Sequence, residues 1–125
     1  MLSNKKYAML IQNTKMQTLI YIIWRLLNMK YNLPERVLRE LSFFAQEHSV
    51  TKIVLFGSRA RGNNTERSDI DIAVYGGDFD GFYWDIKEKV NSLLMFDIIQ
   101  ANSAISDDLK HEIEKDGVII YEKTR

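Results

Sequence analysis

A short apolar run that stops at a glycine constrains the fold of this chain more than any other feature. Residues 53–56 read Ile-Val-Leu-Phe, and Gly57 and Ser58 follow at once. A β-branched and aromatic run that ends in Gly-Ser is typical of a buried strand entering a turn. Backbone N–H groups that are free after such a turn are well suited to hold a phosphate. We therefore predict a strand with a phosphate-binding turn at its end.

Two carboxylates mark the start of the next apolar run. Residues 70–74 read Ile-Asp-Ile-Ala-Val, and Asp69 and Asp71 stand two residues apart. Alternate side chains of a strand share a face, so both acids point one way while Ile70 and Ile72 point into the core. Mg²⁺ prefers a few carboxylate oxygens together with the phosphates of a substrate. A metal site beside a phosphate-binding turn indicates nucleotide chemistry.

The spacing of these two motifs resembles that of a known superfamily. Gly57-Ser58, ten residues and then Asp69-Ile70-Asp71 are similar to the signature of the nucleotidyltransferases of the DNA polymerase β superfamily. The flanking Leu-Phe-Gly-Ser-Arg-Ala-Arg-Gly and Ser-Asp-Ile-Asp-Ile-Ala-Val resemble in particular the minimal nucleotidyltransferases, the antitoxin partners of HEPN-domain toxins. The resemblance extends from about Pro34 to the C-terminus. An Asp-x-Asp pair alone is a weak signal, but after a strand and Gly-Ser at this spacing it is specific.

A third acid, Asp97, interrupts the apolar run 95–99. By itself such an acid is explained by an edge strand, where an inward charge discourages pairing with another chain. Beside Asp69 and Asp71, one acid on a neighbouring strand instead completes a three-carboxylate site. In the family that this chain resembles, that acid lies beside the metals and helps to activate the attacking hydroxyl. Three acids this close would repel one another without cations, so we expect two Mg²⁺ ions at Asp69, Asp71 and Asp97.

Three arginines, Arg59, Arg61 and Arg67, flank the Gly-Ser turn. Surface arginines are commonly just solvated, but guanidinium groups also pair bidentately with phosphate oxygens. Arg59 and Arg61 lie two apart at a helix start, so they cannot both face one ligand well. We expect the site for ATP to be formed by the turn and its two nearest arginines: Gly57, Ser58, Arg59 and Arg61. One arginine would contact phosphate, and the other an acid or a partner.

Composition limits the remaining possibilities. At 125 residues the chain is long enough for one core. Its 17 basic and 17 acidic residues cancel, so no global field suggests direct binding of nucleic acid. The absence of cysteine excludes disulfides and thiolate zinc sites, and it fits the reducing cytoplasm, where we expect the protein. His48 and His111 are expected to be structural or solvated, because they lie at a predicted helix end and on an acidic helix.

The first part of the chain differs in character from the rest. Residues 1–34 hold five basic residues and no acid, whereas the remainder holds 12 basic and 17 acidic residues. The apolar run Leu19–Leu27 is shorter than the about 20 residues that a membrane span needs, so we expect no membrane contact. Two interpretations stay open: a translated upstream leader or loosely attached extension with the true start at Met29, or an added helix that covers an apolar face or contacts a partner. We take 1–31 as an N-terminal extension and 32–125 as the nucleotidyltransferase domain.

Apolar periodicity and turn residues predict alternating helices and strands. Helices are expected over 18–28, 34–48, a short segment from 58 or 59, 81–94 and 107–115, and strands over 52–56, 69–75, 95–100 and 118–121. A capping box of Asn32 and Glu35 is expected to open the helix at 34, and Leu93 and Leu94 to lie on the inner side of helix 81–94. This alternation is typical of an α/β domain. The resemblance implies a two-layer, polymerase β-like fold, with a mixed sheet packed with helices.

The resemblance implies a Mg-dependent nucleotidyltransferase that moves AMP from ATP to a hydroxyl group. The residues from Pro34 onward hold the nucleotide-binding half and leave no room for an acceptor domain, so another protein is expected to bring the acceptor. The candidate is a HEPN toxin, a helical ribonuclease whose tyrosine is adenylylated and silenced within a hetero-oligomer. Two alternatives stay open: an antitoxin that acts only by covering its toxin, and a subunit of a small-molecule nucleotidyltransferase.

Overall fold

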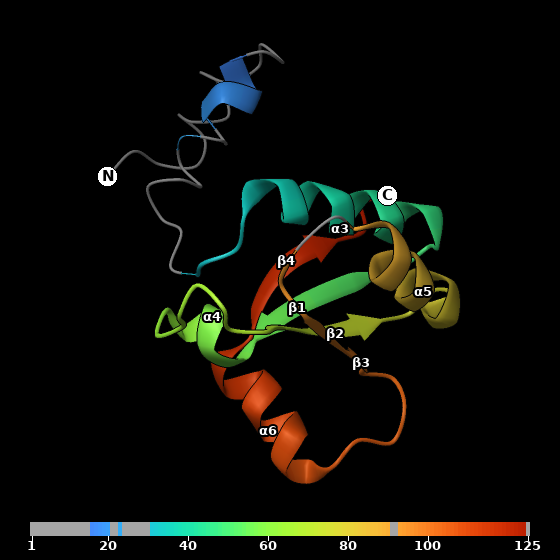
Figure 1. Cartoon of the computed structure of the whole chain (residues 1–125). Coiled ribbons are helices and arrows are strands. Elements are labelled where there is room, and N and C mark those ends of the chain that lie inside the picture. The colour runs from blue at the N-terminus through green and yellow to red at the C-terminus, as the bar shows by residue number, and fades with distance from the viewer. Residues whose placement is uncertain (1–15, 21–22, 24–30, 91–92, 125) are drawn as a thin grey trace, which may run out of the picture.

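The computed structural model of the protein describes residues 16–20, 23, 31–90 and 93–124 (Figure 1). From residue 35 onward, helices alternate with strands. The elements are, in chain order, α3 (Glu35–Glu47), β1 (Lys52–Phe56), α4 (Gly57–Arg61), β2 (Ile70–Tyr75), α5 (Phe79–Lys89), β3 (Phe96–Gln100), α6 (Asp107–Asp116) and β4 (Val118–Glu122). Their order is the one expected from the sequence, and their bounds agree within two residues except at the end of α5.

The strands form one mixed sheet in the order β3-β2-β1-β4. β1 is antiparallel to both of its neighbours, β2 and β4, whereas β2 and β3 are parallel. A parallel pair needs a crossover connection, and α5 supplies it. The expected α/β fold with a mixed sheet is confirmed.

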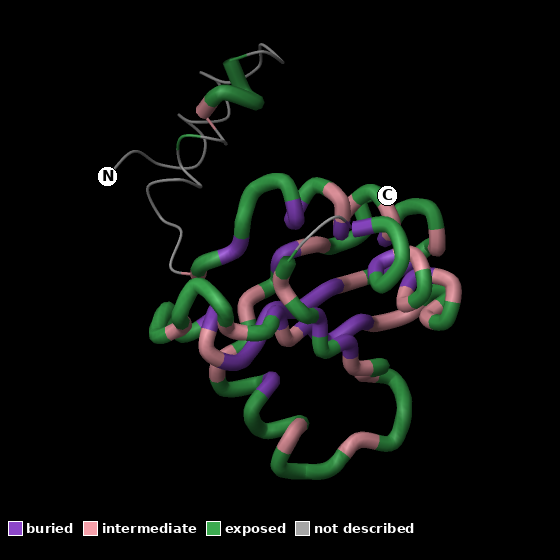
Figure 2. The backbone as a smooth tube through the Cα atoms, viewed as in Figure 1, coloured by how far each residue is buried: buried purple, intermediate pink, exposed green. Residues whose placement is uncertain are grey.

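Helices α3 and α5 cover one face of the sheet, and α6 lies against the other face (Figure 1). The larger core cluster lies under α3 and α5 and includes Ile70, Ile72 and Val74 of β2. Buried residues lie along the strands and also on α3 and α5 (Figure 2). The alternate residues face α6, where Ile113 belongs to a smaller cluster with Val54, Phe56 and Ala73. Ile70 and Ile72 therefore point into the core as expected. Since side chains alternate along a strand, Asp71 points to the α6 side.

The capping box expected at the start of α3 is not formed. The helix begins after Pro34, and no side chain of the described residues caps it. Asn32 is engaged through its backbone instead. Its N–H donates to the carbonyl of Arg59 over 3.0 Å, and its own carbonyl accepts from the Arg59 guanidinium over 3.1 Å. The chain before α3 is thus fastened to α4.

Helix α5 ends earlier than the sequence predicts. Val90 already has an extended conformation at the helix C-terminus, and residues 93 and 94 are not helical. Leu94 packs against the core as expected, but Leu93 is fully exposed. The prediction of a helix to residue 94 is therefore wrong, because the chain must turn there to enter β3.

His48, directly after α3, holds that end of the helix to α5. Its Nε2 lies 2.6 Å from Oδ2 of Asp85. The hydrogen bond from His48, followed by the one from Lys89, lowers the pKa of the Asp85 carboxyl. His48 therefore has a structural contact, as the sequence analysis expected.

Little of the N-terminal extension belongs to the described residues. Residues 16–20 and 23 are helical. The remainder of the helix expected over 18–28, and most of the extension 1–31, lie outside the described residues. In the part of the chain that the structure describes, no helix is both long and apolar enough to cross a membrane.

Candidate active site

The turn after β1 and the acid near the start of β2 lie in contact. Phe56 and Asp71 are register partners in the β1–β2 ladder, so Gly57 follows directly beside Asp71. Gly57 has φ +73°, in the left-handed region that favours glycine. A Cβ atom at position 57 would lie 2.3 Å from Oδ2 of Asp71. Glycine therefore allows the turn to approach the carboxylate this closely.

Helix α4 starts directly from the last residue of β1. No side chain among the described residues caps its N-terminus. The first N–H groups of a helix have no carbonyl partner within the helix. Without a capping side chain, these N–H groups of α4 can donate to a bound group. Gly57 is buried and Ser58 is half-buried at this turn. The turn thus has the donors that phosphate binding needs.

Asp71 and Asp97 face each other across the parallel β2–β3 ladder as register partners. Asp71 is half-buried and Asp97 is exposed. Burial is the main cause that raises the pKa of the Asp71 carboxyl from 3.8 to about 6. The negative charges of Asp97, Asp69 and Glu112 raise this pKa further, in that order, whereas Arg61 lowers it. The structure thus brings the three predicted acids close enough to repel one another.

This set of acids suits a divalent cation. Among the described residues, no three acidic, histidine or cysteine side chains are already gathered to hold a metal ion. Asp69, Asp71 and Asp97 are instead neighbours, and a bound cation would offset their repulsion. Mg²⁺ is usually held in proteins by one or two carboxylates together with the phosphates of a substrate. The three carboxylates are therefore of the kind that Mg²⁺ prefers, but they are not already gathered around one point.

The two predicted nucleotide-binding arginines have different surroundings. Arg61 pairs with Asp116 on α6 at 3.2 Å, and 39% of its side chain is exposed. Arg59 is only 3% exposed, and its guanidinium donates to three backbone carbonyls. Because all three of its nitrogens already donate to carbonyls, this guanidinium has few N–H groups left for a phosphate. We therefore keep Arg61 as a candidate phosphate contact and give Arg59 a different role.

Two acids of α6 were missed by the sequence analysis. The charge of Glu112 acts on Asp71, and Asp116 pairs with Arg61. Both stand in an acidic helix whose apolar pattern does not reveal which part of the sheet it covers. Only the packing of α6 against β1 and α4 brings them to the site.

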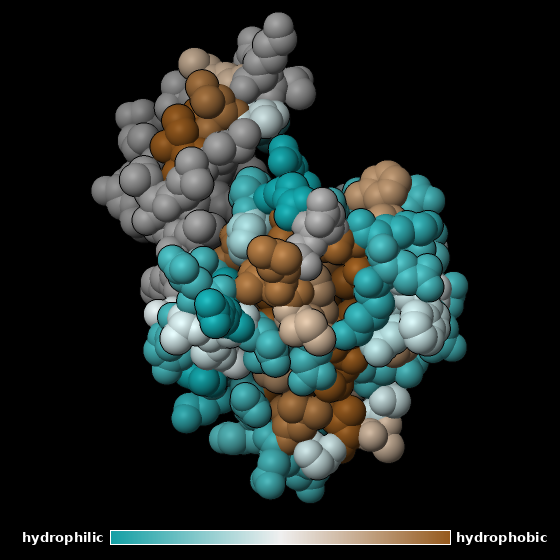
Figure 3. All heavy atoms as spheres, in the orientation of Figure 1, coloured by the Kyte–Doolittle hydropathy of each residue, from teal (hydrophilic) through white to brown (hydrophobic). Residues whose placement is uncertain are grey.

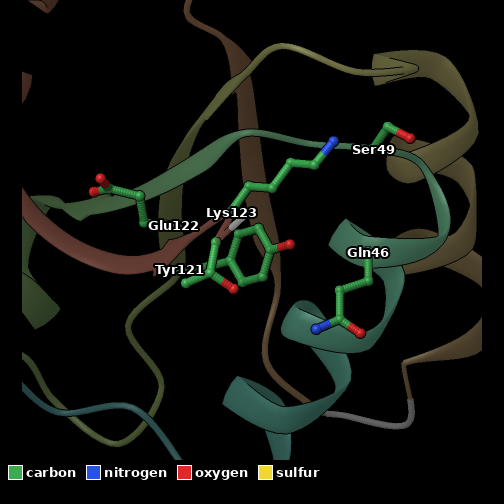
Figure 4. Close-up of a pocket in the computed structure, with 6 residues that line it drawn as sticks. Gln46, Ser49, Tyr121, Glu122 and Lys123 are labelled. Atoms are coloured by element: carbon green, nitrogen blue, oxygen red, sulfur yellow. The ribbon is translucent and has the colours of Figure 1, made fainter.

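A pocket lies at the far end of the sheet, and its lining does not include Asp69, Asp71 or Asp97. Its lining comes from the end of α3, the following turn and the end of β4: Gln46, Ser49, Tyr121, Glu122, Lys123 and Thr124 (Figure 4). Tyr121 pairs with Ile53 near the start of β1, whereas Asp71 pairs with Phe56 at the end of β1. This pocket is therefore separate from the candidate active site.

Exposed apolar side chains precede Asp97. Leu93 is fully exposed and Met95 is 66% exposed. Met95 directly precedes β3 and stands two residues before Asp97, so in an extended chain the two side chains point to the same side. Figure 3 shows a hydrophobic area on the surface turned toward the viewer, in the region where the chain enters β3. An apolar surface thus borders the acidic edge.

These features occur together in a known family. The family described as "Polymerase beta, Nucleotidyltransferase" matches residues 40–125. The chain belongs to this family. The matched region of this polymerase β-type nucleotidyltransferase includes the Gly57 turn, both acid-bearing strands and α6. The resemblance seen in the sequence motifs is therefore confirmed.

One relative of this nucleotidyltransferase is similar over a short region. The "Putative protein adenylyltransferase" of Methanocaldococcus jannaschii is 62% identical over 32 residues. The similar region makes up 25% of this chain and 32% of the relative. The chain therefore matches about a third of that protein's length.

Two solved structures resemble the fold of this nucleotidyltransferase. One, described as a toxin-antitoxin with AMP-PNP, has a TM-score of 0.56 and 25% identity, over 69% of this chain and 73% of the other. A second, described as a mutant of the toxin-antitoxin MntA-HpeT, has a TM-score of 0.55 and 23% identity over the same shares. At that lower identity, the second likeness shows the fold alone.

Proposed function

We propose that this protein transfers AMP from ATP to a hydroxyl group of another protein, namely a tyrosine of a cognate HEPN toxin, and thereby acts as an antitoxin. The observation that carries the proposal is the position of Asp71. Its carboxylate touches the Gly57 turn on one side and faces Asp97 across the ladder on the other. A phosphate held by the turn would lie beside carboxylates suited to bind its metal.

The Gly57-Ser58 turn and the three acids have different roles in this reaction. The N–H groups of the Gly57-Ser58 turn and the Ser58 hydroxyl hold the β- and γ-phosphates. Asp69, Asp71 and Asp97 would hold two Mg²⁺ ions, which would supply positive charge to the entering and leaving oxygens. Little covalent chemistry is asked of the protein, so positioning and electrostatics dominate.

The reaction is an in-line displacement at the α-phosphorus. The acceptor oxygen forms a bond to that phosphorus while the bond to the bridging oxygen of the β-phosphate breaks, and pyrophosphate leaves with the bonding electrons. The proton of the acceptor hydroxyl passes to Asp97 or to solvent. Asp97 suits this role because it is exposed at the site, where an incoming hydroxyl can reach it.

Two observations support a protein acceptor. The exposed apolar side chains Leu93 and Met95 lie directly before Asp97, where a docked protein would cover them. The names of the similar proteins point in the same direction, since one is described as a protein adenylyltransferase and one as a toxin-antitoxin with AMP-PNP. Each AMP would add a negative charge and a bulky nucleoside to the toxin, which would hinder the approach of RNA phosphates.

Mass spectrometry of the toxin tests this function. Toxin incubated with this protein, ATP and Mg²⁺ should gain mass in units of AMP, and the Asp69→Asn, Asp71→Asn double variant should add none. Arg39→Met is a matched control, because Arg39 is exposed on α3, away from the acids. Unmodified toxin that is still neutralised in a stoichiometric complex would favour inhibition by covering. If the toxin is neither modified nor neutralised, the antitoxin role is refuted.

A further inference from the structure

One charged side chain of the candidate site is buried instead of facing solvent. Among the described residues, Arg59 is the only polar or charged residue that is buried. Burying a charge is costly unless it is fully hydrogen-bonded, so a buried arginine on a five-residue helix calls for a physical reason. The sequence analysis placed Arg59 in the nucleotide site and left open whether it or Arg61 contacts phosphate.

The Arg59 guanidinium binds backbone carbonyls of two other segments. Its Nε donates to Ser68 over 3.0 Å and its Nη2 to Glu66 over 3.2 Å, both in the loop that leads into β2. Its Nη1 donates to Asn32, before α3, over 3.1 Å. The backbone carbonyl of Arg59 also accepts from the Asn32 N–H. A planar fork with donors on three nitrogens can serve three such acceptors at once.

The loop that Arg59 grips has internal bonds of its own. The N–H of Thr65 donates to the Ser68 hydroxyl over 2.9 Å, and the N–H of Ser68 donates to the Thr65 carbonyl over 3.2 Å. Holding the Glu66 and Ser68 carbonyls therefore fixes this turn as one unit. Ser68 is covalently joined to Asp69, and Asp71 follows two residues later.

We infer that Arg59 is a positioning residue, which fixes the carboxylates of Asp69 and Asp71 relative to the phosphate-binding turn. Arg59 stands in the first turns of α4, two residues after Gly57, and its side chain crosses to the segment that carries the acids. The Arg59 guanidinium thus connects the Gly57 turn to the segment that carries Asp69 and Asp71. This inference rests on the proposed nucleotide site, because it says how that site keeps its geometry.

Two substitutions in the full-length chain separate positioning from charge. Arg59→Lys keeps the charge, but one ammonium cannot match three carbonyls arranged around a planar fork. Arg59→Met removes all donors and keeps much of the length. We expect AMP-PNP with Mg²⁺ to bind at least about tenfold more weakly to Arg59→Lys, and more weakly still to Arg59→Met, because small displacements of positioned groups have large effects. Arg39→Met should bind as the wild type does.

Hydrogen exchange gives a second readout that does not depend on nucleotide. In Arg59→Lys, amides in residues 63–69 should exchange faster while those of β1 and β2 stay protected. Wild-type affinity for AMP-PNP in Arg59→Lys would overturn the inference, as would faster exchange spread evenly over the sheet. If the wild type itself fails to bind AMP-PNP, the proposed function fails. Faster exchange confined to residues 63–69 in Arg59→Lys would then still support the positioning role of Arg59. Unchanged exchange in these residues would overturn that role.

Discussion

Oδ2 of Asp71 lies 2.3 Å from the place that a Cβ atom at position 57 would take, which is too close for any residue other than glycine unless the carboxylate moves. The last residue of β1, Phe56, is the register partner of Asp71, so this contact is built into the β1–β2 ladder. The Gly57 turn and the first acidic strand, β2, are thus one structural unit. Changes to either partner should affect both.

Replacing Gly57 by alanine tests this contact. The left-handed φ of +73° costs a non-glycine residue about 1–2 kcal/mol, and the new methyl group must displace the Asp71 carboxylate. We expect Gly57→Ala to lower the melting temperature by several degrees and to abolish binding of AMP-PNP with Mg²⁺. Gly62→Ala is a control, because Gly62 also has a positive φ, of +82°, but ends α4 away from Asp71. Equal loss of binding in the two variants would contradict the proposed contact.

Replacing Asp71 by asparagine should stabilise the metal-free protein. Burial and the neighbouring acids raise the pKa of Asp71 in the folded state to about 6. An acid with a raised pKa binds its proton more tightly when folded, so its contribution to stability is greatest below about pH 4 and falls as the pH rises to about 6. Ionisation of Asp71 in the folded protein lowers the free energy of unfolding by about 1 kcal/mol once screening by water is allowed for, since Asp71 is only half-buried.

Thermal unfolding in EDTA between pH 4 and pH 7 measures this effect. The melting temperature of Asp71→Asn should exceed that of the wild type by an amount that grows from pH 4 to pH 6 and then levels off. Asp107→Asn, at the other end of α6, should show no such growth. A constant difference across the range would argue against a raised pKa of Asp71 in the folded protein.

The Arg61–Asp116 ion pair allows the role of Arg61 to be tested with a matched pair of substitutions. The pair is partly exposed, so breaking it from either side should cost less than about 1 kcal/mol. If Arg61 contacts phosphate, Arg61→Gln should weaken AMP-PNP binding severalfold. Asp116→Asn, which frees the arginine, should leave that binding unchanged or stronger. Titration calorimetry of both variants decides, and equal weakening would assign Arg61 to structure alone.

Two N-terminal truncations should differ in stability. A chain that begins at Met29 keeps Asn32 and Leu33, and we expect its melting temperature to stay within a few degrees of the full chain. A chain that begins at Pro34 loses the hydrogen bonds between Asn32 and Arg59 as well as the buried Leu33 side chain. Burial of a leucine contributes about 1.5–3 kcal/mol, so this shorter chain should melt well below the first. Similar melting of both would show that the Asn32 contact adds little.

Local patterns in the sequence were sufficient to predict the order of the elements and to predict that the three acids are neighbours. The run Ile53–Phe56 ending at Gly57 predicts β1 and its turn because strand formers and a glycine are short-range signals. The spacing of Asp69 and Asp71 predicts a shared face for the same kind of reason, and the alternation of helices and strands predicts the α/β class. The end of α5 was misplaced, since periodicity cannot show where a chain must turn to enter a strand.

The tertiary structure alone decided which distant residues meet. The sequence could not distinguish the surroundings of Arg59 from those of Arg61, because both stand in one short helix. The difference comes from what surrounds them: the loop at Glu66 and Ser68 closes over Arg59, whereas α6 brings Asp116 to Arg61. Such contacts depend on how elements pack, and packing is the sum of many weak contacts between segments that no local pattern records.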